Sequence, residues 1–220
     1  KAELGDGLEN HSEFNEVPHF LSEDLLSRDE TYREFTLIRG QCLAAYAFLE
    51  NSLVSLFAHL MGTSRDFAGV SFFKMNNARA RNATLERLLK KRHGSTHNIF
   101  WNSYSEQLRG LDAKRNNIVH WATRSEYISG PPISKVVLVP PNYEDGDENT
   151  PEIRLENLIE FIERCDFLAR LTEMFLFILG SRLAFVNRDE ANKILPTWIE
   201  IFQNPIAYPP PEAHPLCRKH

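Results

Sequence analysis

The chain has 220 residues, of which 42% are hydrophobic and 25% charged, an ordinary composition for a globular domain. A chain of this length buries roughly 70% of its unfolded surface, so neither a disulfide nor a metal ion is needed for folding. The net charge of −5 argues against a protein that coats nucleic acid without specificity.

Residues 1–28 are acidic and irregular, and we expect them to form an N-terminal arm that packs through a few apolar side chains. A long helix is predicted from Asp29 to Met61, because its apolar residues recur every three or four positions. Asp29 is a suitable N-cap, and Gly62 ends the helix. The apolar stripe is wide, so this helix should face more than one neighbour.

The segment 62–77 predicts a loop with a short helical turn near Phe67–Phe73. A second helix is expected from Ala78 to Arg92, and Gly94 stops it. A third helix follows from Thr96 or His97 to Trp121, again on apolar spacing.

The pattern changes after the third helix. Residues 133–139 are β-branched and followed by prolines, which predicts a strand. Its expected partner is 152–155, giving a small hairpin near 131–155. A fourth helix is predicted from Leu155 to Arg182. A shorter helix is expected near Asp189–Phe202, with an interruption at Pro196.

These elements predict a mainly helical, all-α domain over residues 29–203, built as a bundle of four to five helices with the hairpin inserted. Residues 204–220 are rich in proline and predict an extended or disordered, flexible tail.

The cysteines indicate a reducing, cytoplasmic compartment. Cys42, Cys165 and Cys217 are far apart, which suits neither a zinc site nor a disulfide framework. Cys42 and Cys165 lie in apolar helical stretches and are expected in the core. No secretory leader and no membrane association are expected, since the first apolar run comes late and is interrupted by charge, and the stretch 167–179 is too short to span a bilayer.

Basic residues are concentrated in the middle of the chain. Between Arg79 and Arg124 there are ten Lys or Arg and three acidic residues, a charge of +7, which leaves −12 on the rest. Such a segment either guides a polyanion to one place or forms a solvated helix face, and the sequence leaves both interpretations open.

The end of the third helix carries residues whose chemistry suits RNA cleavage. Arg115 falls in the apolar seam of Leu111 and Ile118, so its guanidinium requires a partner, a cavity or an anion. His120 lies about 140° around the helix and roughly 7.5 Å along it, and Asn116 shares its face. An imidazole transfers protons near neutral pH, and a guanidinium binds phosphate bidentately.

The segment 115–120, Arg-Asn-Asn-Ile-Val-His, resembles the R-x4–6-H motif of HEPN domains, including the polar residue directly after the arginine. The setting is similar too, because the motif closes a helix that is followed by an insertion and another long helix. The resemblance covers about residues 29–182. It implies a metal-independent endoribonuclease without cofactors, in which a homodimer brings both Arg/His pairs into one cleft and the RNA 2′-hydroxyl attacks to leave a 2′,3′-cyclic phosphate.

Many HEPN proteins act as toxins or in antiviral defence, so the resemblance also implies an antitoxin or other regulatory partner. Some HEPN toxins carry a modified tyrosine two residues after the histidine, where this chain has Ala122. The pairs Arg87/His93 and Arg92/His97 match the motif spacing as well, but they straddle the helix stop near Gly94. His93 and His97 are four residues apart, a spacing that two metal ligands on one helix can have, yet no third ligand is evident.

Three further residues near the motif are candidates for binding RNA. Arg109 and Lys114 are expected to hold phosphates, with a solvated helix face as the alternative. Trp121 is a candidate for stacking on a base, with a place in the interior as the alternative.

In the first helix, Glu50 and Asn51 are candidates for orienting Arg115, with an exposed helix face as the alternative. A purely structural interpretation instead pairs Arg115 with Glu50 and gives His120 a structural hydrogen bond. At the level of function, the alternative to an endoribonuclease is a non-catalytic HEPN-like module that binds RNA, a nucleotide or a protein partner.

Overall fold

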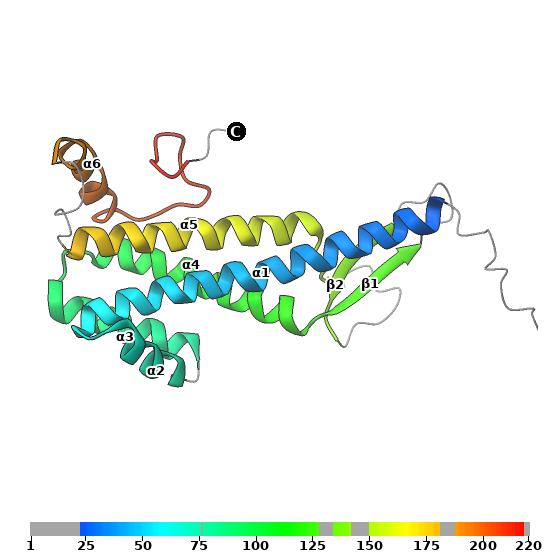
Figure 1. Cartoon of the computed structure of the whole chain (residues 1–220), viewed down its shortest axis with the longest axis horizontal. Coiled ribbons are helices and arrows are strands. Elements are labelled where there is room, and N and C mark those ends of the chain that lie inside the picture. Colours follow the sequence, from blue (N-terminus) through cyan, green and yellow to red (C-terminus); the bar gives the residue numbers. More distant parts are fainter. Residues whose placement is uncertain (1–22, 76, 128–133, 142–149, 181–187, 218–220) are drawn as a thin grey trace, which may run out of the picture.

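The protein is mainly α-helical, and the part of the chain that the computed structural model describes holds six helices and one two-stranded sheet. The two longest helices, α1 (Glu23–Met61) and α5 (Leu155–Gly180), lie side by side, and α4 (Asn98–His120) packs against both (Figure 1). The described residues are 23–75, 77–127, 134–141, 150–180 and 188–217.

The long first helix begins earlier than the sequence predicts. It starts at Glu23, so Asp29 lies inside it and is not its N-cap. Residues 23–29 contain neither proline nor glycine, so nothing in them breaks a helix. Most of the predicted arm, residues 1–22, lies outside the described residues.

Two short-range caps define the helices that follow. Ser64 accepts a hydrogen bond from the backbone of Phe67 and begins α2 (Arg65–Lys74), which is longer than the predicted turn. Asn77 caps α3 (Ala78–His93) in the same way, and Gly94 ends it with a φ of +62°, a conformation that glycine adopts without strain.

The segment 152–155 is not the main partner of the strand predicted at residues 133–139 and contributes only one bridge residue. Strand β2 (Ser134–Val139) pairs antiparallel with β1 (Ala122–Tyr127), which directly follows α4. Ile153 makes only an isolated bridge to Leu138, with two hydrogen bonds of 2.9 Å. The sequence of β1 is polar and lacks the alternation of a half-buried strand, so periodicity did not reveal it.

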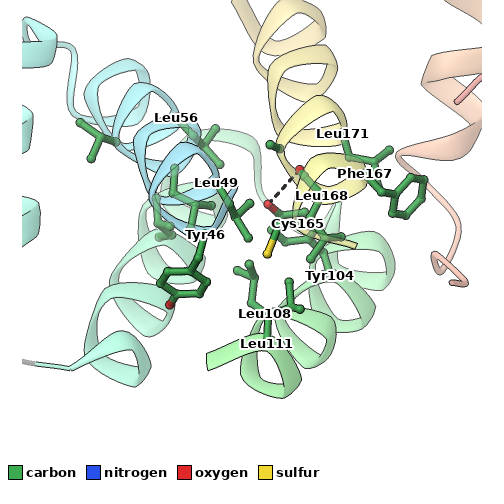
Figure 2. Close-up of a cluster of buried hydrophobic side chains, with 14 of the residues drawn as sticks. Tyr46, Leu49, Leu56, Tyr104, Leu108, Leu111, Cys165, Phe167, Leu168 and Leu171 are labelled. Carbon is green, nitrogen blue, oxygen red and sulfur yellow. Dashed lines mark hydrogen bonds between the residues drawn. The ribbon is translucent and has the colours of Figure 1, made fainter. Parts of the chain in front are cut away.

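The core lies where α1, α4 and α5 meet (Figure 2). The predicted burial of Cys42 and Cys165 is confirmed, and burial raises the pKa of the Cys42 thiol to about 11. Tyr46 lies at the edge of this core with its hydroxyl turned away from it. The labelled core side chains come from α1 (Leu49, Leu56), α4 (Tyr104, Leu108, Leu111) and α5 (Cys165, Phe167, Leu168, Leu171).

The C-terminal region differs from the expectation of an interrupted helix and an extended tail. Helix α6 (Arg188–Ile201) continues through Pro196, and the tail turns back along α5 (Figure 1). The rings of Tyr208 and His214 lie 5.6 and 5.5 Å from that of Phe167, measured between centroids. Aromatic side chains placed among the prolines therefore give the tail a packing surface that its composition alone did not indicate.

One helical stretch within the described residues, Glu30–Met61, is long and apolar enough to cross a membrane by length and composition alone. The stretch 167–179 is not such a segment. About half of the most apolar part of Glu30–Met61 is buried in the protein, and core helices of globular domains have the same length and composition.

Candidate functional site

The motif residues lie in the last turns of α4, directly before the sheet. Arg115 is half-buried, whereas Asn116 and His120 are exposed. Arg115 follows the fully buried Leu111 by one turn, so the seam that packs α4 into the core carries this guanidinium to the edge of the interior.

Arg115 is held in a defined direction by two contacts. Its guanidinium carbon lies 5.6 Å from the ring centroid of Tyr46, within the range of a cation–π interaction. Its Nη1 atom donates a hydrogen bond of 3.1 Å to Oδ1 of Asn116. Because Asn116 and His120 are four residues apart on one helix, this bond directs the positive charge toward the face that carries the imidazole.

A second layer of polar groups lies beneath Arg115. The hydroxyl of Tyr46 donates a short hydrogen bond to Oδ1 of Asp112. Burial raises the pKa of the Asp112 carboxyl, while the Tyr46 hydroxyl and the guanidinium groups of Arg81 and Arg115 oppose that shift. Asp112, rather than Glu50, is thus the acidic neighbour of Arg115.

The side chains predicted to orient Arg115 from α1 contact other arginines. Glu50 forms an ion pair of 2.6 Å with Arg81 of α3, and Oδ1 of Asn51 accepts a hydrogen bond of 3.4 Å from Arg65 of α2. Arg81, Glu50 and Asp112 line a cavity of about 10 Å³, which is room for one water molecule at most. This space is too small for a substrate, so the layer supports Arg115 without forming a pocket.

The end of α4 is fastened to α1 by Arg39, a residue that the sequence did not single out. Its guanidinium donates to the backbone oxygens of Ile118 (2.9 Å), Val119 (3.1 Å) and Trp121 (3.0 Å). These carbonyls belong to the last turn, which has no helical partner for them. The position of His120 is therefore fixed from a helix about eighty residues earlier in the chain.

His120 points to solvent, and its side chain makes no hydrogen bond or ion pair within the described part of the chain. Arg109 is also exposed and lies eleven residues earlier, which brings it to within about 20° of His120 around the helix at ~100° per residue. Arg109, Asn116 and His120 thus share one exposed face of α4.

The other two predicted RNA contacts have structural neighbours. The Lys114 ammonium lies 3.2 Å from a carboxylate oxygen of Glu160 on α5. Trp121 is half-buried and packs against the hydrophobic core. Neither side chain lies with the group of Arg109, Asn116 and His120.

Sequence reasoning missed Arg39, Tyr46 and Asp112. The one available signal was an arginine placed among the apolar seam residues of the first helix, next to Ile38. Over the described residues, no group of three or more His, Cys, Asp or Glu side chains is arranged to hold a metal ion. No protein-family model, curated protein or solved structure matches this chain.

Proposed function

We propose that this chain is a HEPN-like domain and that the end of α4 is one half of a metal-independent RNA-cleaving site. The observation that carries the proposal is the hydrogen bond from Arg115 to Asn116, beside the exposed His120. A cation fixed before substrate arrives stabilises developing negative charge without further reorganisation.

In the proposed reaction, His120 takes the proton of the RNA 2′-hydroxyl as the 2′-oxygen attacks the neighbouring phosphorus. The bond from phosphorus to the 5′-oxygen breaks, and the leaving oxygen receives a proton from the partner's His120. Arg115 binds the non-bridging oxygens, which carry the charge of the transition state. The products are a 2′,3′-cyclic phosphate and a 5′-hydroxyl, and the positioned base contributes about 10²–10⁴-fold.

The test is cleavage of a labelled single-stranded RNA in EDTA. Wild-type protein should leave cyclic phosphate ends, and His120→Ala and Arg115→Ala should lose at least about 10²-fold in rate. Asn102→Ala, at an exposed position on the first half of the same helix, is the matched control and should cleave like wild type. A His120→Ala variant that cleaves RNA at the wild-type rate would contradict the proposal.

The second half of the site requires a second copy, so the proposal includes a homodimer. Light scattering at micromolar concentration should give twice the chain mass of 25.4 kDa. A monomeric mass together with full cleavage activity would rule out a composite site. The toxin or defence role that HEPN proteins often have, with its antitoxin, is the biological setting in which we place the activity.

A non-catalytic module is the second candidate. The exposed apolar residues of α1, including Leu37 at 62% and Phe48 at 50% exposure, favour a surface for a protein partner. Stoichiometric RNA or protein binding without turnover would support this candidate over the enzyme.

A further inference from the structure

Helix α2 (Arg65–Lys74) has one face buried and one face open. Ala68 and Phe72 are buried, and the Phe72 ring lies 5.6 Å from that of Phe57 on α1. The guanidinium of Arg81 covers the Phe72 ring at 5.3 Å. The buried side thus fixes α2 on the bundle through α1 and through Arg81 of α3.

The open face of α2 displays large apolar side chains. Phe67, Val70 and Phe73 are 75%, 67% and 52% exposed, and we call these three residues the α2 stripe. The Phe73 ring packs edge-on against Phe72 at 5.7 Å with an interplanar angle of 89°, so its orientation is set while half of it stays open. Large apolar side chains exposed on one face of a helix mark an interaction surface.

Basic residues lie at both ends of the α2 stripe. Residues 65–93 contain eight Lys or Arg and two acidic residues, a charge of +6 in a chain whose net charge is −5. Arg65 and Lys74 lie at the two ends of α2, and Arg79 stands in the first turn of α3, all three of them exposed. The stripe therefore favours a partner that is anionic and also has flat apolar groups.

The α2 stripe lies on the opposite side of α2 from Phe72, whose ring is covered by Arg81 of α3. Arg81 and Asp112 line a small interior cavity, so the contacts that connect α2 with α4 run behind the stripe. The α2 stripe is therefore a surface separate from the end of α4.

We propose that Phe67 and Phe73 form a base-stacking surface for single-stranded RNA, with Arg65, Lys74 and Arg79 binding its phosphates. The inference deepens the proposed RNA cleavage and rests on it for the identity of the substrate. The two rings are about 9 Å apart along the helix axis. Aromatic side chains within a positively charged track are the usual means of holding single strands without sequence preference. The sequence suggested Trp121 for base stacking, but Trp121 is half-buried, so we assign stacking to the more exposed rings of Phe67 and Phe73.

An anionic bilayer is the competing partner for a basic surface with apolar side chains. The stripe consists of three side chains on a ten-residue helix whose other face is buried in the bundle, so it offers little apolar area for insertion into a bilayer. This small area, together with the RNA substrate of the proposed cleavage, favours the nucleic acid.

The experiment measures fluorescence anisotropy of a labelled oligouridine of about 12 nucleotides with the full-length His120→Ala protein in EDTA. On that background, the leucine pair Phe67→Leu and Phe73→Leu keeps the apolar character but removes the rings, and should weaken binding at least about tenfold. The tyrosine pair Phe67→Tyr and Phe73→Tyr restores the rings and should bind like the parent. Ile99→Ala, 60% exposed on α4, is the control for loss of an exposed apolar side chain.

Leucine variants that bind as tightly as the parent would overturn the inference, as would a parent protein that binds no RNA. Leucine variants that no longer sediment with phosphatidylserine vesicles, although the parent protein does, and that still bind RNA like the parent would assign the α2 stripe to a membrane. Ring-dependent RNA binding by a wild-type protein that never cleaves would support the stacking surface and count only against the proposed catalysis.

Discussion

The two halves of α4 have opposite characters. The first half carries Phe100, Trp101 and Tyr104, each at most 2% exposed, in a cluster of stacked and tilted rings. The second half also buries Leu111 and Ile118, but between them it carries the half-buried charges of Asp112 and Arg115.

The first half thus explains why the bundle folds, since apolar burial is the main favourable term. In the second half, the half-buried charges offset part of the stabilisation from Leu111 and Ile118, because those charges must find partners. At this end of α4, Tyr46 holds Asp112, and Arg39 holds the backbone carbonyls. Polar groups that reduce stability but are kept in fixed positions are what a functional site requires. The difference between the halves can be tested by removing one supporting contact at a time.

The largest effect is expected in the apolar half. Phe100→Ala removes a ring that packs at 4.9 Å against both Phe175 and Phe202, and should lower the free energy of unfolding by about 3–5 kcal/mol. Urea unfolding followed by circular dichroism measures this. Ile99→Ala, one residue earlier and exposed, should change stability by less than about 0.5 kcal/mol. Similar losses for both variants would contradict the assignment of the core.

At the polar end, Arg39→Met removes the donor for three carbonyls of the last turn. The expected loss is about 1.5–3 kcal/mol of stability, because those oxygens lose a charged partner. RNA cleavage should fall further than the unfolded fraction explains, since His120 loses its alignment. Gln41→Met, exposed on the same helix, serves as the control, and equal stability of the two variants would show that Arg39 is dispensable.

Beneath Arg115, Tyr46→Phe leaves the Asp112 carboxyl without its hydroxyl donor, which should cost about 1–3 kcal/mol. The loss should be smaller when Asp112→Asn is already present, because the buried group is then uncharged. A double-mutant cycle on unfolding free energies gives the coupling, and additive losses would mean that the two side chains act independently.

The smallest effect is expected at the end of α3. Burial lowers the pKa of His93 below its ordinary 6.5, and His97, His59 and Arg92 add to that shift. The unfolded state then binds more protons, so the stability that depends on His93 is complete above pH 6.5 and is lost as the pH falls through the lowered value.

Wild type should therefore lose a few degrees more in melting temperature than His93→Gln between about pH 7.5 and about pH 5.5. Parallel losses in thermal unfolding scans would show that His93 does not contribute to the acid sensitivity.

The sequence predicted most of the helices, because apolar spacing of three and four residues reports a helix directly. It failed for β1, whose residues are polar, and for the tail, whose few aromatic residues pack against α5. It predicted that Arg115 lies in the apolar seam of the third helix, but it did not predict which side chains surround Arg115. Arg39 and Tyr46 reach the end of α4 from 79 and 66 residues away, and no local pattern connects such positions.

The carbonyl cap at the end of α4 also has an electrostatic consequence. The C-terminus of a helix carries a partial negative charge of about half an elementary charge, which repels phosphate. Arg39 places a full positive charge against those carbonyls. A polyanion can therefore approach His120 at a helix end that would otherwise repel it.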